Sequence, residues 1–290
     1  MKANVADIIA MMDMIAPPDL AEDWDNVGLQ VGLAEWNVDK IWIALDPTPQ
    51  VMAAACNNHV DLLITHHPLI FKPLKSVDLN KAIGSIINQA IQNKTAIFAA
   101  HTNLDTVSGG VNDVLSERIG LMNTTVLVKP AGTGRLNNET KAYDTYPLVT
   151  AERHNGLGRV GKLEKDMCLK DFSGVVRERL GLENIRVVGN PGLRVFKAAV
   201  CSGSGSGLMG HFFSSGAQVY ISGDIGYHNA RDVESANLGL IDLGHFASEH
   251  LIIDSVVTRL RKMTADSKMD ICIEGCTIER DPFWCIDDIV

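Results

Sequence analysis

The chain has 290 residues, of which 46% are hydrophobic and 21% charged, and its formal net charge is −9. This composition is that of a globular protein with one large or two small α/β domains, long enough to fold without stapling disulfides. The acidic balance argues against nucleic acid as a partner over most of the surface.

The first residues lack the layout of a signal peptide, because Asp7 and Asp13 interrupt any apolar core. No apolar run approaches the roughly 18 residues of a membrane span. The six cysteines are scattered, and none forms a CxxC pair. We therefore expect a cytoplasmic protein with reduced thiols and no membrane partner.

Apolar periodicity and turn residues predict an alternation of helices and strands. In chain order, helices are predicted over 5–15, 49–58, 79–92, 111–118, 171–180 and 247–263, and strands over 40–45, 61–65, 96–100, 195–200, 218–221 and 238–243. Residues 129–157 mix Pro, Gly, Asn and Thr, which indicates loops and short strands. Residues 264–290 lose the alternation. The pattern predicts a three-layer α/β/α fold with a C-terminal tail.

Polar clusters follow five of the predicted strands. They are His66-His67, residues 101–105, residues 202–207, residues 224–228 and residues 245–249. Ligands of open α/β sheets bind beyond the carboxyl ends of strands. Because polar clusters follow five strands in this way, we expect a functional site at the carboxyl ends of the strands.

Three of these clusters carry residues of the kind that bind metals. The turn at Pro68 lets His66 and His67 splay toward different ions, while His101 with Asp105 and His245 with Glu249 pair imidazole with carboxylate. Nitrogen and oxygen donors without thiolate suit Zn, Mn, Fe or Co. A two-ion site also needs a bridging carboxylate, which Glu249 or Asp105 could provide. A lone buried histidine is more often a core residue, but three clusters together favour a metal site.

The other histidines, His59, His154, His211 and His250, are predicted to be surface or packing residues.

Other motifs allow two interpretations each. The run SGSGSG at 202–207 predicts either a phosphate cradle or a tight strand-to-helix turn. Asp224 either lines the site together with His228 or is a helix N-cap. Asp25-Asn26 forms a turn or reaches the metals. A three-cysteine metal site from Cys272, Cys276 and Cys285 is a weaker alternative to a disordered or capping tail.

At these residues the chain resembles the NIF-three-like family, whose members are labelled GTP cyclohydrolase I type II homologues. The matching segments are WDNVGLQVG at 24–32, THHPLIF at 65–71, HTNLD at 101–105, CSGSGS at 201–206, SGDIGYH at 222–228 and GHFASE at 244–249. They stand in the family's order, and the set is highly specific.

The resemblance implies two divalent metal ions per subunit. By motif, His66, Asp105 and Glu249 would hold one ion, and His67, His245 and Glu249 the other, with His101 nearby as an acid/base or supporting residue. It also implies two related halves with mixed sheets, here about 1–128 and 129–263, and a toroidal homohexamer. The motif at 156–162 follows Asp105 too soon for the domain that many members insert, so the chain resembles the short form. We expect residues after Thr264 to be dispensable for metal binding, since every proposed ligand precedes them.

Two functions follow from this reading. The first is metal-assisted hydrolysis of a phosphorylated small molecule, with His101 or His228 shuttling protons. The family label implies that the reaction opens the imidazole ring of GTP with release of formate. The second is a non-catalytic, metal-dependent regulatory or protein-interaction factor. Open coordination positions would favour the first, and saturated ions the second.

Overall fold

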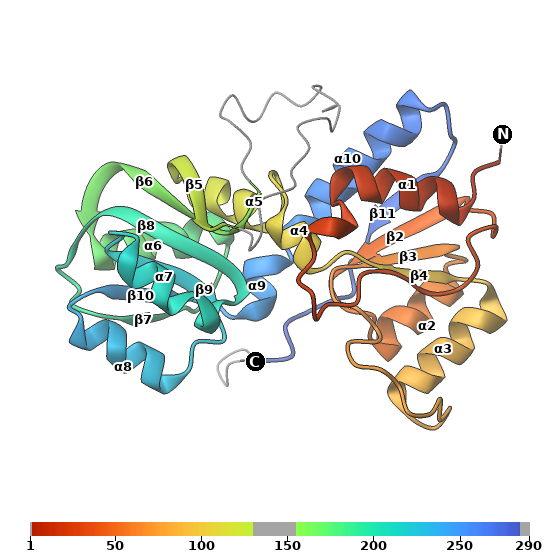
Figure 1. Cartoon of the computed structure of the whole chain (residues 1–290), viewed down its shortest axis with the longest axis horizontal. Helices are drawn as coiled ribbons and strands as arrows, with labels where there is room; N and C mark the ends of the chain where they lie inside the picture. The colour runs from red at the N-terminus through yellow and green to blue at the C-terminus, as the bar shows by residue number, and fades with distance from the viewer. Residues whose placement is uncertain (1, 130–154, 285–290) are drawn as a thin grey trace. The chain divides into compact units, whose positions relative to one another are not determined.

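The computed structural model describes residues 2–129 and 155–284, and these fall into two compact units, each of which we describe by itself (Figure 1). The first unit is Met1–Leu104 with His250–Val290, and the second is Asp105–Glu249. Most of the predicted loop region, together with His154 and Cys285, lies outside the described residues.

The first unit is built on a five-stranded sheet with the strand order β1-β4-β3-β2-β11. Its strands are β1 (Gly28–Val31), β2 (Lys40–Ala44), β3 (Leu62–Thr65), β4 (Ala96–Ala99) and β11 (Cys272–Gly275). All neighbours pair in parallel except β1, which runs antiparallel to β4. Thr65 stands opposite Ala99 in the register of β3 and β4. The chain therefore leaves both strands at the same level of the sheet edge.

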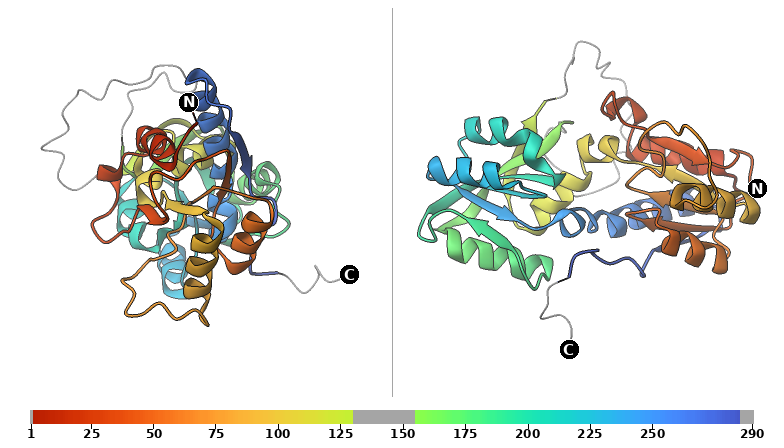
Figure 2. Two further views of the ribbon diagram at one scale, coloured as in Figure 1. Left: turned by 90° about the vertical axis from the view of Figure 1, so that its right-hand side faces the viewer. Right: turned by 90° about the horizontal axis from the view of Figure 1, so that it is seen from below.

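Two helix pairs cover the two faces of this sheet (Figures 1 and 2). Helices α1 (Val5–Ile15) and α10 (Ile252–Asp266) lie on one face, and α2 (Pro49–Asn57) and α3 (Ala82–Asn93) on the other. The start of α1 is fixed by a capping box, in which the Asn4 and Asp7 side chains bond each other's backbone N–H groups. Thr48 caps α2, with Pro49 at its first position. The result is the three-layer arrangement predicted from the sequence.

The second unit holds a six-stranded sheet with the order β5-β6-β8-β9-β10-β7. Its strands are β5 (Met122–Val128), β6 (Leu157–Cys168), β7 (Arg186–Val188), β8 (Arg194–Ser204), β9 (Val219–Gly223) and β10 (Gly239–Asp242). The central strands β8, β9 and β10 are parallel, and the other pairings are antiparallel. Both sheets are thus mixed, as expected.

Helices pack on both faces of the second sheet. Residues of α7 (Met209–Ser214) and α8 (Tyr227–Ser235) share a core with Tyr220 of β9. On the opposite face, Leu169 at the start of α6 (Leu169–Leu180) lies against Gly239 of β10. Helices α5 (Val111–Arg118) and α9 (His245–Glu249) contact β8 and carry residues of the candidate site.

The division of the chain differs from the predicted halves and tail. The last segment is part of the first unit: α10 extends to Asp266, and β11 pairs in parallel with β2. The predicted helix over 247–263 is two helices, α9 and α10. The short CIEG strand carries no alternation of its own, and it is stabilised by hydrogen bonds to a strand about 230 positions earlier. In the described part of the chain, no helix is long and apolar enough to cross a bilayer.

Candidate metal centre

Three imidazoles meet at the carboxyl edge of the first unit's sheet. His66 and His67 follow β3, and His101 follows β4 after one residue. The potential ligand atoms of the three side chains lie within 4.8 Å of one another. The parallel strands β3 and β4 end at the same level of the sheet, which brings His66, His67 and His101 together at the edge where the sequence predicted a site.

Each of these histidines is oriented through the same ring nitrogen. The Nδ1 of His66 lies 3.0 Å from the carbonyl oxygen of Ala100, so it donates a proton there. The Nδ1 of His67 is 2.8 Å from the Asp46 carboxylate, and that of His101 is 2.9 Å from the Asp25 carboxylate. Metal-binding histidines commonly donate one ring N–H to an oxygen, which presents the other nitrogen to the ion. The trio has this arrangement.

Asp25 is a supporting residue behind His101. Its side chain is fully buried, and it also accepts hydrogen bonds from the backbone and hydroxyl of Thr102. Burial opposes its ionisation, but the hydrogen bonds from His101 and Thr102 outweigh it and hold the pKa of the carboxyl well below its ordinary value. Asp25 therefore stays charged and fixes the tautomer of His101, and within the described residues the groups of metal-type ligands do not include it.

Asp46, which orients His67, is held by a residue that the sequence analysis missed. Glu279 accepts hydrogen bonds of 2.8–3.0 Å from the backbone N–H groups of Leu45 and Asp46, at the end of β2. Its side chain is 3% exposed. Burial raises the pKa of this carboxyl, against the opposing effect of the hydrogen bonds from Asp46 and Leu45. No local sequence pattern predicts this role, because Glu279 lies 233 positions after Asp46, in the segment that was expected to be a tail.

The second unit carries a histidine–carboxylate pair on α9. His245 and Glu249 stand four residues apart on one helical face, with Nε2 of His245 3.0 Å from Oε2 of Glu249. The Nδ1 of His245 lies 2.8 Å from the Asp224 carboxylate. Asp224 therefore orients His245 and is not an N-cap, since Gly226 occupies that position of α8.

The glycine-rich turn packs against this pair. Gly203 has φ +60°, and a Cβ there would meet Oε1 of Glu249 at 2.0 Å. The backbone N–H groups of Ser202, Gly203 and Gly205 donate to Asn112, Ser248 and Ser222 respectively. These three N–H groups are therefore already bonded within the protein, and the turn packs closely against Glu249.

Asp105 belongs to the same environment in the second unit. The hydroxyl of Ser202 donates to its Oδ1 at 3.3 Å, and Asn112 donates to its backbone carbonyl at 3.0 Å. Asn112 thus bonds both the Ser202 backbone and the Asp105 backbone. The backbone of Asp105 is thus joined to the turn beside Glu249 through Asn112 of α5, and its carboxylate is joined to that turn directly through Ser202.

The other histidines have different surroundings. His228 is exposed on the first turn of α8, its ring 5.5 Å from that of Tyr227. Within the described residues, the groups of metal-type ligands do not include it. His59 and His211 are exposed, and His250 is partly buried with its Nε2 3.8 Å from Glu279. Among the tail cysteines, Cys272 is exposed and Cys276 is buried.

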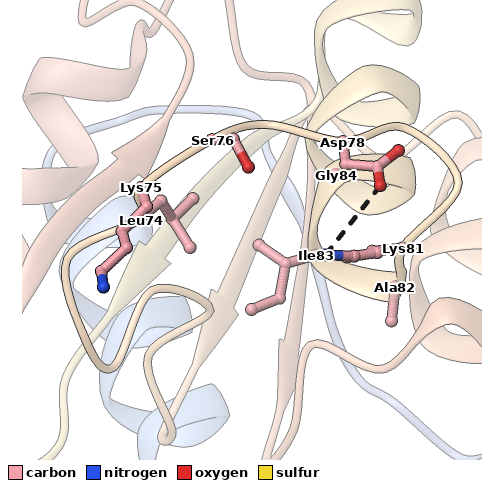
Figure 3. A pocket seen from close by; sticks show the side chains of 8 residues that line it. All are labelled: Leu74, Lys75, Ser76, Asp78, Lys81, Ala82, Ile83 and Gly84. Carbon is pink, nitrogen blue, oxygen red and sulfur yellow. Dashed lines mark ion pairs between the residues drawn. The ribbon is translucent and has the colours of Figure 1, made fainter.

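A cavity of about 450 Å³ lies elsewhere in the first unit, between the 74–78 loop and the start of α3 (Figure 3). Figure 3 shows Lys81 with its ammonium directed to Asp78, 4.0 Å away. A Cβ at Gly84 would meet the carbonyl of Asp78 at 2.1 Å, so the loop packs closely on the helix start. None of the proposed metal ligands lines this cavity.

A comparison with protein families gives a match over nearly the whole chain. The profile of the Duf34/NIF3 (NGG1p interacting factor 3) family matches residues 3–282. The chain belongs to this family. It is 33% identical to a "GTP cyclohydrolase 1 type 2 homolog" of Clostridium perfringens, over 98% of this chain and 99% of that one.

A homologue from Bacillus subtilis with the same name is 28% identical over 97% of this chain and 98% of its own. That alignment runs over 366 positions, more than the 290 residues here, so the Bacillus protein carries residues without a counterpart in this short form. The fold matches the crystal structure of a Bacillus cereus protein related to NIF3, with a TM-score of 0.86, 30% identity and coverage of 99% and 100%.

Proposed function

We propose that this chain is a metal-dependent hydrolase that holds two divalent ions, Zn, Mn, Fe or Co. In this proposal His66, Asp105 and Glu249 bind one ion, and His67, His245 and Glu249 bind the other. The names of the relatives support a nucleotide as substrate. Opening of its imidazole ring is the reaction that the family resemblance implies.

The observation that carries the proposal is the common orientation of the histidines. His66, His67 and His245 each place Nδ1 on an oxygen acceptor, which turns Nε2 of each ring toward other groups of metal-ligand type, as where Nε2 of His245 lies 3.0 Å from Glu249. The donor set of imidazoles and carboxylates without thiolate fits a catalytic rather than a structural zinc-type site. Gly203 supports this fit, because it leaves room for the carboxylate that would bridge the ions.

Chain connectivity supports a shared role for ligands from the two units. Asp105 follows the last residue of the first unit's N-terminal segment and lies four residues after His101. Glu249 directly precedes His250, where the chain returns to the first unit. The carboxylate ligands thus stand at the two places where the backbone passes from one unit to the other.

Two divalent ions, when bound, supply Lewis-acid polarisation and a nucleophile from water near neutral pH. The residues of the chain then orient and transfer protons. His101, fixed through Nδ1 by the charged Asp25, offers Nε2 as the proton-transfer group. His228, which is exposed on α8, is proposed as a second proton carrier.

The test is turnover of a panel of nucleotides and phosphoesters by metal-loaded protein, with elemental analysis of each sample. We expect about two ions per chain and hydrolysis of at least one substrate, both reduced in Glu249→Gln. Metal content of at most one ion after reloading would contradict the two-ion centre. Two bound ions without any turnover would instead favour the non-catalytic interaction factor suggested by the family's description.

A further inference from the structure

Two large aromatic side chains lie exposed in the first unit. Trp24 is 57% exposed and Phe71 48% exposed. Their ring centroids are 5.6 Å apart, and the ring planes are tilted by 58°. Leaving two neighbouring aromatic rings in water forgoes the favourable burial of a large apolar area, so a paired exposed patch indicates a binding surface.

This aromatic pair adjoins the histidine cluster. The ring of His101 lies 6.0 Å from that of Trp24 and 6.3 Å from that of Phe71, both at steep angles. The ring of His101 also lies 5.2 Å from that of His66 and 5.5 Å from that of His67. His101 is therefore a neighbour of both the exposed aromatic rings and the two proposed ligands.

The backbones that carry the pair are locked in place. Trp24 directly precedes Asp25, whose buried carboxylate bonds His101 and Thr102. Phe71 directly follows Ile70, whose carbonyl accepts a 2.6 Å hydrogen bond from the Asn26 amide.

Gln30 completes this network. Its Oε1 accepts hydrogen bonds from the Asn26 amide and from the backbone N–H of Ile70. The loops at 24–26 and 70–71 are thus joined to each other and to His101. The two rings form a preorganised surface, which lowers the entropy cost of binding.

We propose that Trp24 and Phe71 form the binding platform for a planar heteroaromatic ring, such as a purine, that the chain presents to His101 and the metal-binding histidines. This inference rests on the proposed function for the role of the ions, and it adds the residues that bind the ring of the substrate. Aromatic side chains stack on the π-face of a base with little dependence on its identity. The platform selects for a ring, while other contacts choose among rings.

Equilibrium binding to the metal-loaded full chain tests this. The ligands are GTP, guanosine and, as a ringless control, tripolyphosphate. We expect Trp24→Ala and Phe71→Ala to weaken guanosine and GTP binding by about 5- to 100-fold each, as loss of a stacking side chain does elsewhere. Tripolyphosphate binding should not change. Trp24→Tyr should retain most of the affinity, and Trp284→Ala, at another exposed tryptophan, should have no effect.

Circular dichroism and metal content confirm that each variant is folded and loaded. Unchanged guanosine and GTP binding in both alanine variants would overturn the proposal, as would failure of the wild-type chain to bind either ring ligand. A change of oligomeric state without a change of ligand binding would assign the pair to a contact between subunits instead. Because the experiment measures binding, an absence of hydrolase activity alone would not contradict the binding role of Trp24 and Phe71.

Discussion

Each histidine of the candidate centre has its own oxygen acceptor. Asp25, Asp46 and Asp224 serve His101, His67 and His245, and a backbone carbonyl serves His66. These acceptors fix the tautomer, so each imidazole presents the same nitrogen before any metal arrives. Replacing an acceptor is expected to weaken metal binding by roughly 10- to 100-fold without removing a ligand.

Glu249 and His101 are expected to differ in their effect on metal content. If Glu249 bridges two ions, Glu249→Gln removes a negative charge and a ligand shared by both, and at least one position should empty. His101→Ala should lower affinity or activity by roughly 10- to 100-fold while leaving some occupancy. Elemental analysis under identical loading compares them. An empty site in His101→Ala, with both ions kept in Glu249→Gln, would make His101 the ligand and reverse the roles.

Gly203 offers a test of the glycine-rich turn. Gly203→Ala places a Cβ 2.0 Å from Oε1 of Glu249 and strains a backbone at φ +60°, which alone costs about 1–2 kcal/mol. We expect lower metal stoichiometry and a lower melting temperature. Gly207→Ala in the same turn is the matched control, because a Cβ there has no neighbour within 4 Å. Equal behaviour of the two variants would show that the close approach to Glu249 is unimportant.

The sequence predicts which residues gather at the strand ends, but not what holds them. His66, His67 and His101 follow apolar strands, and parallel strands must deliver their ends to one edge. Their acceptors are separated from them by 21 positions for Asp46 and 76 for Asp25. Such pairs depend on loop paths, which no local periodicity encodes.

Among the elements, the C-terminal strand β11 most changes the interpretation of the chain. Its four residues complete the first unit's sheet beside β2, and Glu279 just beyond it bonds the end of β2. The expectation that residues after Thr264 are dispensable for metal binding therefore does not follow from the fold. Their removal would expose the edge of β2 and release the loop that carries Asp46.

Glu279 permits a finer test than deletion. Glu279→Ala leaves two backbone N–H groups without their acceptor, which costs about 1–3 kcal/mol for each one that stays buried. We expect a lower midpoint in chemical denaturation and weaker metal binding through Asp46 and His67. Asp270→Asn, an exposed acidic residue of the same segment, is the control. Unchanged metal affinity in Glu279→Ala would show that Glu279 does not support metal binding through Asp46 and His67.

Two of the strands that the sequence missed, β5 and β6, share a physical cause. β6 is buried at residues 158–161 but exposes Glu164, Lys165 and Asp166, and most of β5 is only partly buried. Both lie toward one edge of the second sheet, where packing demands less apolar surface. Central strands such as β3 and β9 are buried along their length and were readily predicted.

At the scale of the whole molecule, the family resemblance predicts a ring of six subunits. Light scattering at micromolar concentration should report a mass near six times the 31.5 kDa of one chain. A monomer would contradict this. The same measurement on Trp24→Ala and Trp284→Ala shows whether either exposed aromatic residue lies in a subunit contact, since truncating a buried interface aromatic commonly costs more than 2 kcal/mol.

The interrupted first unit also sets the order of events during synthesis. Residues Asp105–Glu249 form a continuous segment and have all their strands before the ribosome reaches α10. The first unit begins earlier but lacks α10 and β11 until the segments that follow the second unit have been made. Domains usually fold from the N-terminus onward. Here the second unit is complete first, and the edge of β2 stays unpaired until β11 has been made. Chains truncated before β11 would therefore carry an open, aggregation-prone edge.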